Sequence, residues 1–321
     1  MDYFLPSWIS PYFQELIHPL YKYLLHVLTQ RCEIERICGD YDQGRHTNRM
    51  TIAFSSSIKH SKQLKHPQLL LFHQPYTEHN QLYTITSIYE EIIQIKHMEN
   101  IQSLTSANMK ACLKSLRLIN AMKISLNNLK NTKFNYAQPE HVELLEKLWK
   151  HLKPNIRRKE NTLITQEWTE LGFQNKDPSS DFRGMGLLGL IQLVYLSEFS
   201  MKDAIDLLNH SQYDHSFFPF AATGINITAY VLELLEKTHL HQHIIKQMDR
   251  ILLQDTMNSI EGCSDDEKCV KFALDVVHDF YAKIFLLFGK TWIAAKPRDV
   301  MEFPRIFKQF KLMIEEEYPS L

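Results

Sequence analysis

The chain has 321 residues, 44% of them hydrophobic, which is enough for one large domain or two smaller ones, each with its own core. Its 36 lysines and arginines almost balance its 37 aspartates and glutamates, so the formal net charge of -1 leaves no basic excess for general nucleic-acid binding. Glycines number only 9, and apolar β-branched residues rarely alternate with polar ones; the composition therefore predicts an all-α fold.

The cysteines predict neither a zinc site nor a disulfide framework. Cys32 and Cys38, and again Cys263 and Cys269, are separated by five residues, a spacing that differs from the Cys-x-x-Cys pairs of zinc sites. We therefore interpret them as reduced thiols of a cytoplasmic protein.

The first 30 residues are rich in aromatic side chains and are interrupted by Pro6, Pro11 and Pro19. Asp2 stands where a secretory signal carries positive charge, and the prolines break the apolar run before a helix could span a bilayer. Neither a signal peptide nor a transmembrane helix is predicted. The aromatics either pack on the rest of the protein or lie at a membrane interface, which makes segment 1–30 a candidate peripheral contact with intracellular membranes.

Apolar residues recur with helical spacing through most of the chain. The first such stretch covers 11–37, whereas residues 40–75 lose the period and are predicted to form a loop with local helix. Further helices are predicted over 82–98, 107–129, 139–152, 186–197, 201–209, 225–239, 240–254, 267–292 and 298–318.

The Asn- and Lys-rich stretch 127–137 is predicted to be a linker. On this basis we expect an N-terminal helical region over 1–130 and a second domain over 136–312. The predicted architecture is a multi-helix globular domain with the N-terminal helical region packed on it.

Residues 168–186 read WTELGFQNKDPSSDFRGMG and are dense in turn-forming residues. A short helix is predicted at their start, with Thr165 as its N-cap and Gly172 as its stop. An Asp-Pro turn at Asp177 and a single arginine, Arg183, follow before a long apolar run.

Gly184, Gly186 and Gly189 form a literal G-x-G-x-x-G. The dinucleotide fingerprint requires a buried strand before the glycines, and here a turn precedes them, so no nucleotide site is predicted. We interpret the glycines as positions where another helix approaches closely.

Two other clusters were weighed as sites. His239 and His243 lie one helical turn apart, with His241 between them, but no glutamate or third ligand accompanies them, so no metal site is predicted. The basic cluster 153–159 is most simply a solvated loop, and its alternatives are contact with an acidic partner or anionic lipid. No catalytic triad, Cys-His pair or carboxylate pair has a recognisable local signature.

Arg183 lies near a predicted helix start, where carboxylates are favourable and a cation is not. One interpretation is a structural ion pair with Asp177 or Asp181, which the planar guanidinium suits. The other is an arginine that a rigid turn presents to the phosphates of a partner. Charge on a transferring γ-phosphoryl group calls for a permanently cationic group with several donors.

The order of these residues resembles the ELMO-domain (engulfment and cell motility) family, and most closely its short members, which activate Arf-family GTPases. The family pattern runs Trp, Gly-Phe-Gln, Asp-Pro, Asp-Phe-Arg-Gly and then a Gly- and Leu-rich helix. The similar positions here are Trp168, Gly172, Phe173, Gln174, Asp177, Pro178, Asp181, Phe182, Arg183, Gly184 and Gly186.

The likeness extends to nearly the whole chain. Segments 28–37, 219–221, 224–228 and 292–303 also resemble family blocks. Tyr195-Leu196 departs mildly from the aromatic pair that closes the family motif.

The resemblance implies a regulator rather than an enzyme with its own substrate: a GTPase-activating protein for Arf-family or Arf-like small GTPases in membrane trafficking. Arg183 is then the catalytic residue, acting in trans. Trp168, Phe173 and Phe182 are expected to hold the turn, and Asp177 and Asp181 to shape it. GTP and Mg²⁺ would belong to the partner, so no cofactor is expected in this chain.

The alternative is a non-catalytic ELMO-type scaffold that binds small GTPases or a Rac exchange factor. Such scaffolds are longer and carry other domains. The arginine is retained here, and the sequence ends at Leu321 without a proline-rich tail. Both points favour the activator.

Overall fold

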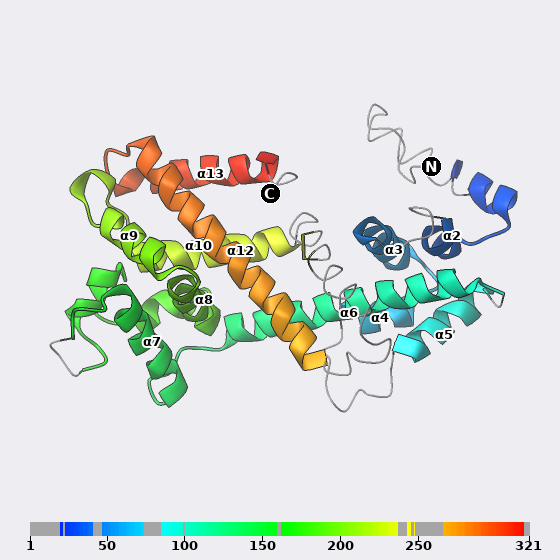
Figure 1. Cartoon of the computed structure of the whole chain (residues 1–321), viewed down its shortest axis with the longest axis horizontal. Coiled ribbons are helices and arrows are strands. Elements are labelled where there is room, and N and C mark those ends of the chain that lie inside the picture. The colour runs from blue at the N-terminus through cyan, green and yellow to red at the C-terminus, as the bar shows by residue number, and fades with distance from the viewer. Residues whose placement is uncertain are drawn as a thin grey trace. The chain divides into compact units, whose positions relative to one another are not determined.

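The computed structural model describes residues 20–21, 23–40, 47–73, 85–98, 100–158, 162–236, 243–244, 247 and 266–317. Every regular element in these ranges is an α-helix or a short 3-10 helix (Figure 1), which confirms the predicted all-α class. None of these helices combines the length and apolar character needed to cross a membrane.

The chain divides into two compact units. The first contains Met1–Ala121 and Ile245–Asp266, and the second contains Met122–Ile244 and Glu267–Leu321. The domain limits expected from the sequence, 1–130 and 136–312, stay predictions, as does the packing of the N-terminal region on the second domain.

The first unit has its own core, in which Met50, Phe54 and Ile92 are fully buried. Thr47 caps α3 by accepting a hydrogen bond from the backbone N–H of Met50. The described helices of this unit are α2 (Glu33–Asp40), α3 (Asn48–His60), α4 (Lys65–Phe72), α5 (Ile85–Lys96) and the first part of α6 (Ser103–Asn131).

Two predictions for this unit were wrong. The helix expected over 11–37 is interrupted, because Gln30 adopts a φ of 54° and a separate helix, α2, begins at Glu33. Residues 11–19 lie outside the described ranges. Residues 40–75, expected to form a loop with local helix, contain two regular helices, α3 and α4, which make up most of the described part of this stretch. The buried face of α3 includes Thr51 and Ser55, whose hydroxyls hid the helical period.

The second unit is arranged around α8, which is apolar on all sides and buried along most of its length. Helices α7, α9 and α10 pack on it (Figure 1). Besides the end of α6, the described elements are α7 (Pro139–Leu152), η3 (Gln166–Leu171), η4 (Pro178–Arg183), α8 (Gly186–Phe199), α9 (Met201–Ser211), η5 (Asp214–Ser216), α10 (Phe220–Glu236), α12 (Asp266–Ala295), η6 (Val300–Glu302) and α13 (Phe303–Glu317).

A glycine allows three of these helices to meet. A Cβ atom at Gly224 would lie 2.5 Å from Leu193 Cδ2 on α8 and 2.8 Å from the hydroxyl of Tyr281 on α12, so glycine lets α10 approach both helices without displacing these side chains. Near the C-terminal end of α12, the buried Trp292 donates a hydrogen bond from Nε1 to the Ser216 carbonyl, at 3.0 Å. The family-like blocks 224–228 and 292–303 thus help to build the core of this unit.

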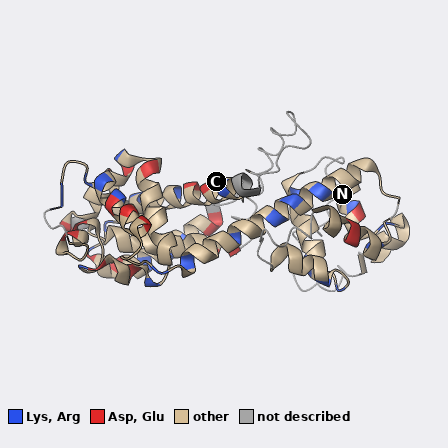
Figure 2. Cartoon of the chain, turned by 90° about the horizontal axis from the view of Figure 1, so that it is seen from below, with Lys and Arg blue, Asp and Glu red and all other residues tan. Residues whose placement is uncertain are grey.

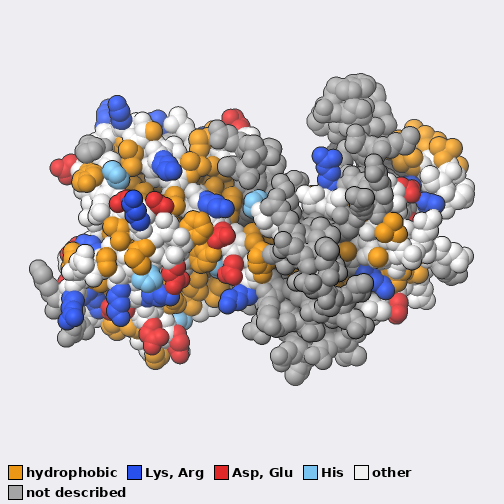
Figure 3. Space-filling model, in the orientation of Figure 1, with side chains coloured by type: hydrophobic (Ala, Val, Ile, Leu, Met, Phe, Trp, Pro, Cys, Tyr) orange, Lys and Arg blue, Asp and Glu red, His pale blue; other side chains and the backbone are white. Residues whose placement is uncertain are grey.

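Acidic and basic residues are interspersed along the described helices (Figure 2). On the face of the second unit seen in Figure 3, hydrophobic side chains also lie among charged ones. These views show no broad basic face of the kind that a nucleic-acid backbone requires.

Candidate functional site

The residues of the family-like motif lie in two consecutive 3-10 helices and the turns around them, immediately before α8. The first, η3, is capped by Thr165, whose Oγ1 accepts from the N–H of Glu167 at 3.3 Å, and it ends at Gly172 with a φ of 78°. This confirms the predicted cap and stop. The second, η4 (Pro178–Arg183), is capped by Asp177, whose side chain accepts from the N–H of Ser179. We call residues 172–186 the arginine turn.

A row of buried aromatic rings supports the arginine turn. Trp168 and Phe173 are nearly perpendicular with ring centroids 6.3 Å apart, and Phe173 and Phe182 meet in the same way at 5.6 Å. Phe182 in turn contacts Phe134 at 5.4 Å. Because Trp168, Phe173 and Phe182 are almost fully buried, they hold the turn in place and do not themselves present a surface to a partner.

Basic residues of the loop before η3 brace the same aromatic row. The Arg158 guanidinium lies 4.5 Å above the ring centroid of Trp168 and pairs with Glu146, while Lys153 pairs with Glu170. The interpretation of 153–159 as a solvated loop was therefore wrong for Arg158, whose side chain is only 9% exposed. Residue 159 lies outside the described ranges.

Both ends of the arginine turn are fixed by close backbone packing. A Cβ atom at Gly172 would lie 2.1 Å from the backbone nitrogen of Phe220, and the Gly172 carbonyl accepts from Ala222 N–H at 3.2 Å. A Cβ atom at Gly186, whose φ is 52°, would lie 2.2 Å from the Lys130 carbonyl oxygen. One end of the turn is thus tied to α10 and the other to the last turn of α6.

The glycines of the G-x-G-x-x-G do not form a phosphate cradle. The Leu187 N–H at the start of α8 is already donated to the Thr132 carbonyl, at 2.8 Å. A Cβ atom at Gly189 would lie 3.3 Å from Ile225 of α10, and so it marks a close helix approach. At Gly184, a Cβ atom would meet nothing within 4 Å, so the close-approach interpretation fails there.

The two carboxylates of the turn are occupied by local hydrogen bonds. Asp177 Oδ1 accepts from the Tyr136 hydroxyl at 2.8 Å and from Ser179 N–H at 3.0 Å. Burial acts to raise the pKa of Asp177, but these hydrogen bonds outweigh it, and the pKa is lowered overall. Asp181 Oδ2 accepts from Gln174 N–H at 2.8 Å, and burial raises the pKa of Asp181.

Arg183 forms no ion pair with any residue that the structure describes, so the expected ion pair with Asp177 or Asp181 is absent. Its Nε donates to the Ser180 carbonyl at 2.7 Å, and the side chain is exposed. That bond fixes the base of the guanidinium, while its two Nη groups make no hydrogen bond within the described ranges. The arrangement offers a pair of forked donors to an external phosphate or carboxylate.

Phe134 and Tyr136 support the site but were not predicted as site residues. Both fall in the stretch interpreted as a linker, yet one packs on Phe182 and the other donates to Asp177. The sequence feature that could have indicated their burial is the presence of two aromatic residues in an otherwise polar, Asn- and Lys-rich segment.

No group of three or more His, Cys, Asp or Glu side chains suited to a metal ion occurs in the described part of the chain. Of the histidine pair weighed as metal ligands, His239 lies outside the described residues, and the ring of His243 lies 6.3 Å from that of Phe280, centroid to centroid.

Comparison with known proteins identifies one family. The ELMO/CED-12 family pattern matches residues 124–307. ELMO domain-containing protein B of Dictyostelium discoideum is 30% identical over 301 residues, covering 92% of this chain and 93% of that protein. Human ELMO domain-containing protein 2 is 29% identical over 286 residues, covering 88% and 85%. Human ELMO domain-containing protein 1 is 28% identical over 323 aligned positions, covering 91% and 86%. No solved structure gives a significant match.

Proposed function

The chain belongs to the ELMO/CED-12 family, and from that premise we propose that it stimulates GTP hydrolysis by Arf-family or Arf-like small GTPases, with Arg183 acting in trans. ELMO-domain proteins are associated with small-GTPase pathways, in which they act as regulators. The observation that carries the finer proposal is the exposed guanidinium of Arg183, which is held at Nε by Ser180 and forms no ion pair with the described residues.

The arrangement suits a transition state better than a ground state. Charge accumulates on the oxygens around the transferred γ-phosphoryl group, and a guanidinium that is already oriented stabilises that charge without reorganising. The aromatic row and the two tied glycines supply the orientation. GTP and Mg²⁺ belong to the partner, and this chain contributes the arginine.

The test is single-turnover GTP hydrolysis by a panel of GTP-loaded Arf-family and Arf-like GTPases, with and without the full chain. We expect at least one member to hydrolyse GTP on the order of 10³-fold faster with the chain present. Rac, loaded in the same way, is the control partner. A non-catalytic scaffold would bind a GTPase and leave its hydrolysis rate unchanged, and that result would contradict the proposal.

The proposal includes a cytoplasmic protein with a peripheral membrane contact near its N-terminus. Residues 20–29 carry apolar side chains at i, i+3, i+4, i+7 and i+8 spacing, on one helical face. These side chains are 46–79% exposed: Leu20, Tyr23, Leu24, Val27 and Leu28.

Flotation with phosphatidylcholine–phosphatidylserine vesicles tests the membrane contact. We expect the Leu24→Glu, Leu28→Glu double variant to lose most vesicle binding, because charge on this face opposes its burial in the interface. The His26→Glu, Thr29→Glu double variant places the same charges on the opposite face and is the matched control. Equal binding by both double variants would contradict the contact.

A further inference from the structure

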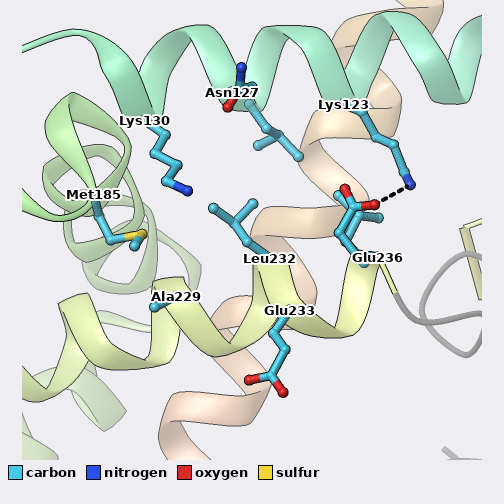
Figure 4. Close-up of a pocket in the computed structure, with 10 residues that line it drawn as sticks. Lys123, Asn127, Lys130, Met185, Ala229, Leu232, Glu233 and Glu236 are labelled. Carbon is cyan, nitrogen blue, oxygen red and sulfur yellow. Dashed lines mark hydrogen bonds and ion pairs between the residues drawn. The ribbon is translucent and has the colours of Figure 1, made fainter. Parts of the chain in front are cut away.

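A groove of about 330 Å³ lies between α6 and α10 in the second unit (Figure 4). Apolar side chains form much of its surface: Leu126 from α6, Met185 from the arginine turn, and Ala229, Leu232 and Leu235 from α10. A volume of this size has room for one or a few protruding side chains.

Within the part of the chain that the structure describes, one of the charged residues lining the groove, Lys130, makes no ion pair. Lys123 pairs with Glu236 at 3.4 Å, and Glu233 pairs with Lys311 of α13 at 2.8 Å. Lys130 forms no ion pair with the described residues. In Figure 4 its side chain extends into the groove toward Leu232, whereas Glu233 points away. Among the described residues, the groove thus combines an apolar surface with one ammonium group that makes no ion pair.

The groove is joined to the arginine turn through the backbone. Met185 follows Arg183 by two residues and lines the groove. The Lys130 carbonyl packs against Gly186, and the Thr132 carbonyl accepts from the N–H of Leu187. The groove is thus built from the same backbone segment that holds Arg183.

We propose that the groove receives an apolar side chain, flanked by a carboxylate, from the surface of the GTP-loaded GTPase; this inference rests on the proposed function. Burial of the apolar side chain against Met185, Ala229 and Leu232 supplies affinity. The carboxylate pairs with Lys130 and sets the orientation in which the phosphates reach Arg183.

Two variants test the groove while leaving Arg183 unchanged. Lys130→Glu reverses the unpaired charge, and Ala229→Phe fills the space between the helices. Lys202→Glu is the matched control, because it makes the same charge change at an exposed position of α9 outside the groove. Thermal unfolding establishes that each variant is folded.

The measurement is the Kd for the responsive GTPase loaded with a non-hydrolysable GTP analogue. We expect Lys130→Glu and Ala229→Phe to weaken binding roughly tenfold or more, and Lys202→Glu to bind like the wild type. At saturating activator, Lys130→Glu should recover the wild-type hydrolysis rate, since the groove contributes to binding rather than to the transition state. If Ala229→Phe fails to fold, the comparison of Lys130→Glu with its control Lys202→Glu tests the groove proposal.

Other outcomes separate this proposal from the proposed function. If the wild type stimulates hydrolysis and Lys130→Glu binds equally tightly, the groove proposal is overturned and the proposed function stands. If the wild type binds no member of the panel, both are overturned. If light scattering shows self-association that Lys130→Glu abolishes, the groove receives a second copy of this chain and the proposal is overturned.

Discussion

Replacement of Arg183 by alanine is expected to remove most of the stimulation of GTP hydrolysis, a loss on the order of 10³-fold in rate, because the arginine finger dominates the stimulation in other GTPase systems. The side chain is exposed and makes one hydrogen bond within the described structure, to the Ser180 carbonyl. Its loss should therefore cost no more than about 1 kcal/mol of folding stability. Single-turnover hydrolysis and thermal unfolding of the same preparation separate these two effects.

Arg183→Lys is the informative companion variant. Lysine keeps the positive charge but has no planar fork and no Nε donor for the Ser180 carbonyl. We expect it to retain only a small part of the stimulation. A folded Arg183→Ala protein that stimulates as well as the wild type would remove Arg183 from the mechanism and leave it a structural role.

Gly172→Ala is expected to destabilise the second unit by about 4 kcal/mol and to abolish stimulation with it. The added Cβ atom would lie 2.1 Å from the Phe220 backbone nitrogen and 2.8 Å from the Pro219 carbonyl carbon. Neither backbone atom can move away by a side-chain rotation. The φ of 78° adds strain for any residue with a Cβ atom. Urea unfolding followed by circular dichroism measures the loss.

Gly184→Ala is the matched control in the same turn. Gly184 has a φ of −84°, and a Cβ atom there would have no neighbour within 4 Å. We expect its unfolding free energy to stay within about 0.5 kcal/mol of the wild-type value. Equal stability of Gly172→Ala and Gly184→Ala would contradict the close packing of the arginine turn on α10.

The parts of the fold that follow from local residue chemistry were predictable. The Thr165 hydroxyl caps the start of η3, and Gly172 ends this helix in a left-handed conformation. Both roles depend on residues within a few positions along the chain. Pro139 likewise occupies the start of α7. Helix α3 was missed because Ser and Thr side chains on its buried face weakened the apolar period, and burial of a hydroxyl depends on distant partners.

The motif residues of the site were predicted from the sequence, but the residues that pack against them and hold them in place were not. Phe134 and Tyr136 reach the arginine turn only because the end of α6 is tied to the start of α8. Arg158 lies over Trp168, a contact that charge patterning alone does not indicate. That Arg183 makes no direct ion pair with Asp177 or Asp181 likewise could not be predicted, because each carboxylate accepts hydrogen bonds from other groups of the turn.

The most direct test of the arginine's role compares two states of the partner. The wild type should bind the responsive GTPase at least about 100-fold more tightly when it is loaded with GDP and aluminium fluoride, which mimics the transferring phosphoryl group, than when it is loaded with a GTP analogue. Arg183→Ala should bind the analogue-loaded form like the wild type and show almost no preference for the aluminium fluoride form. An undiminished preference in Arg183→Ala would contradict an arginine that acts in trans on the transition state.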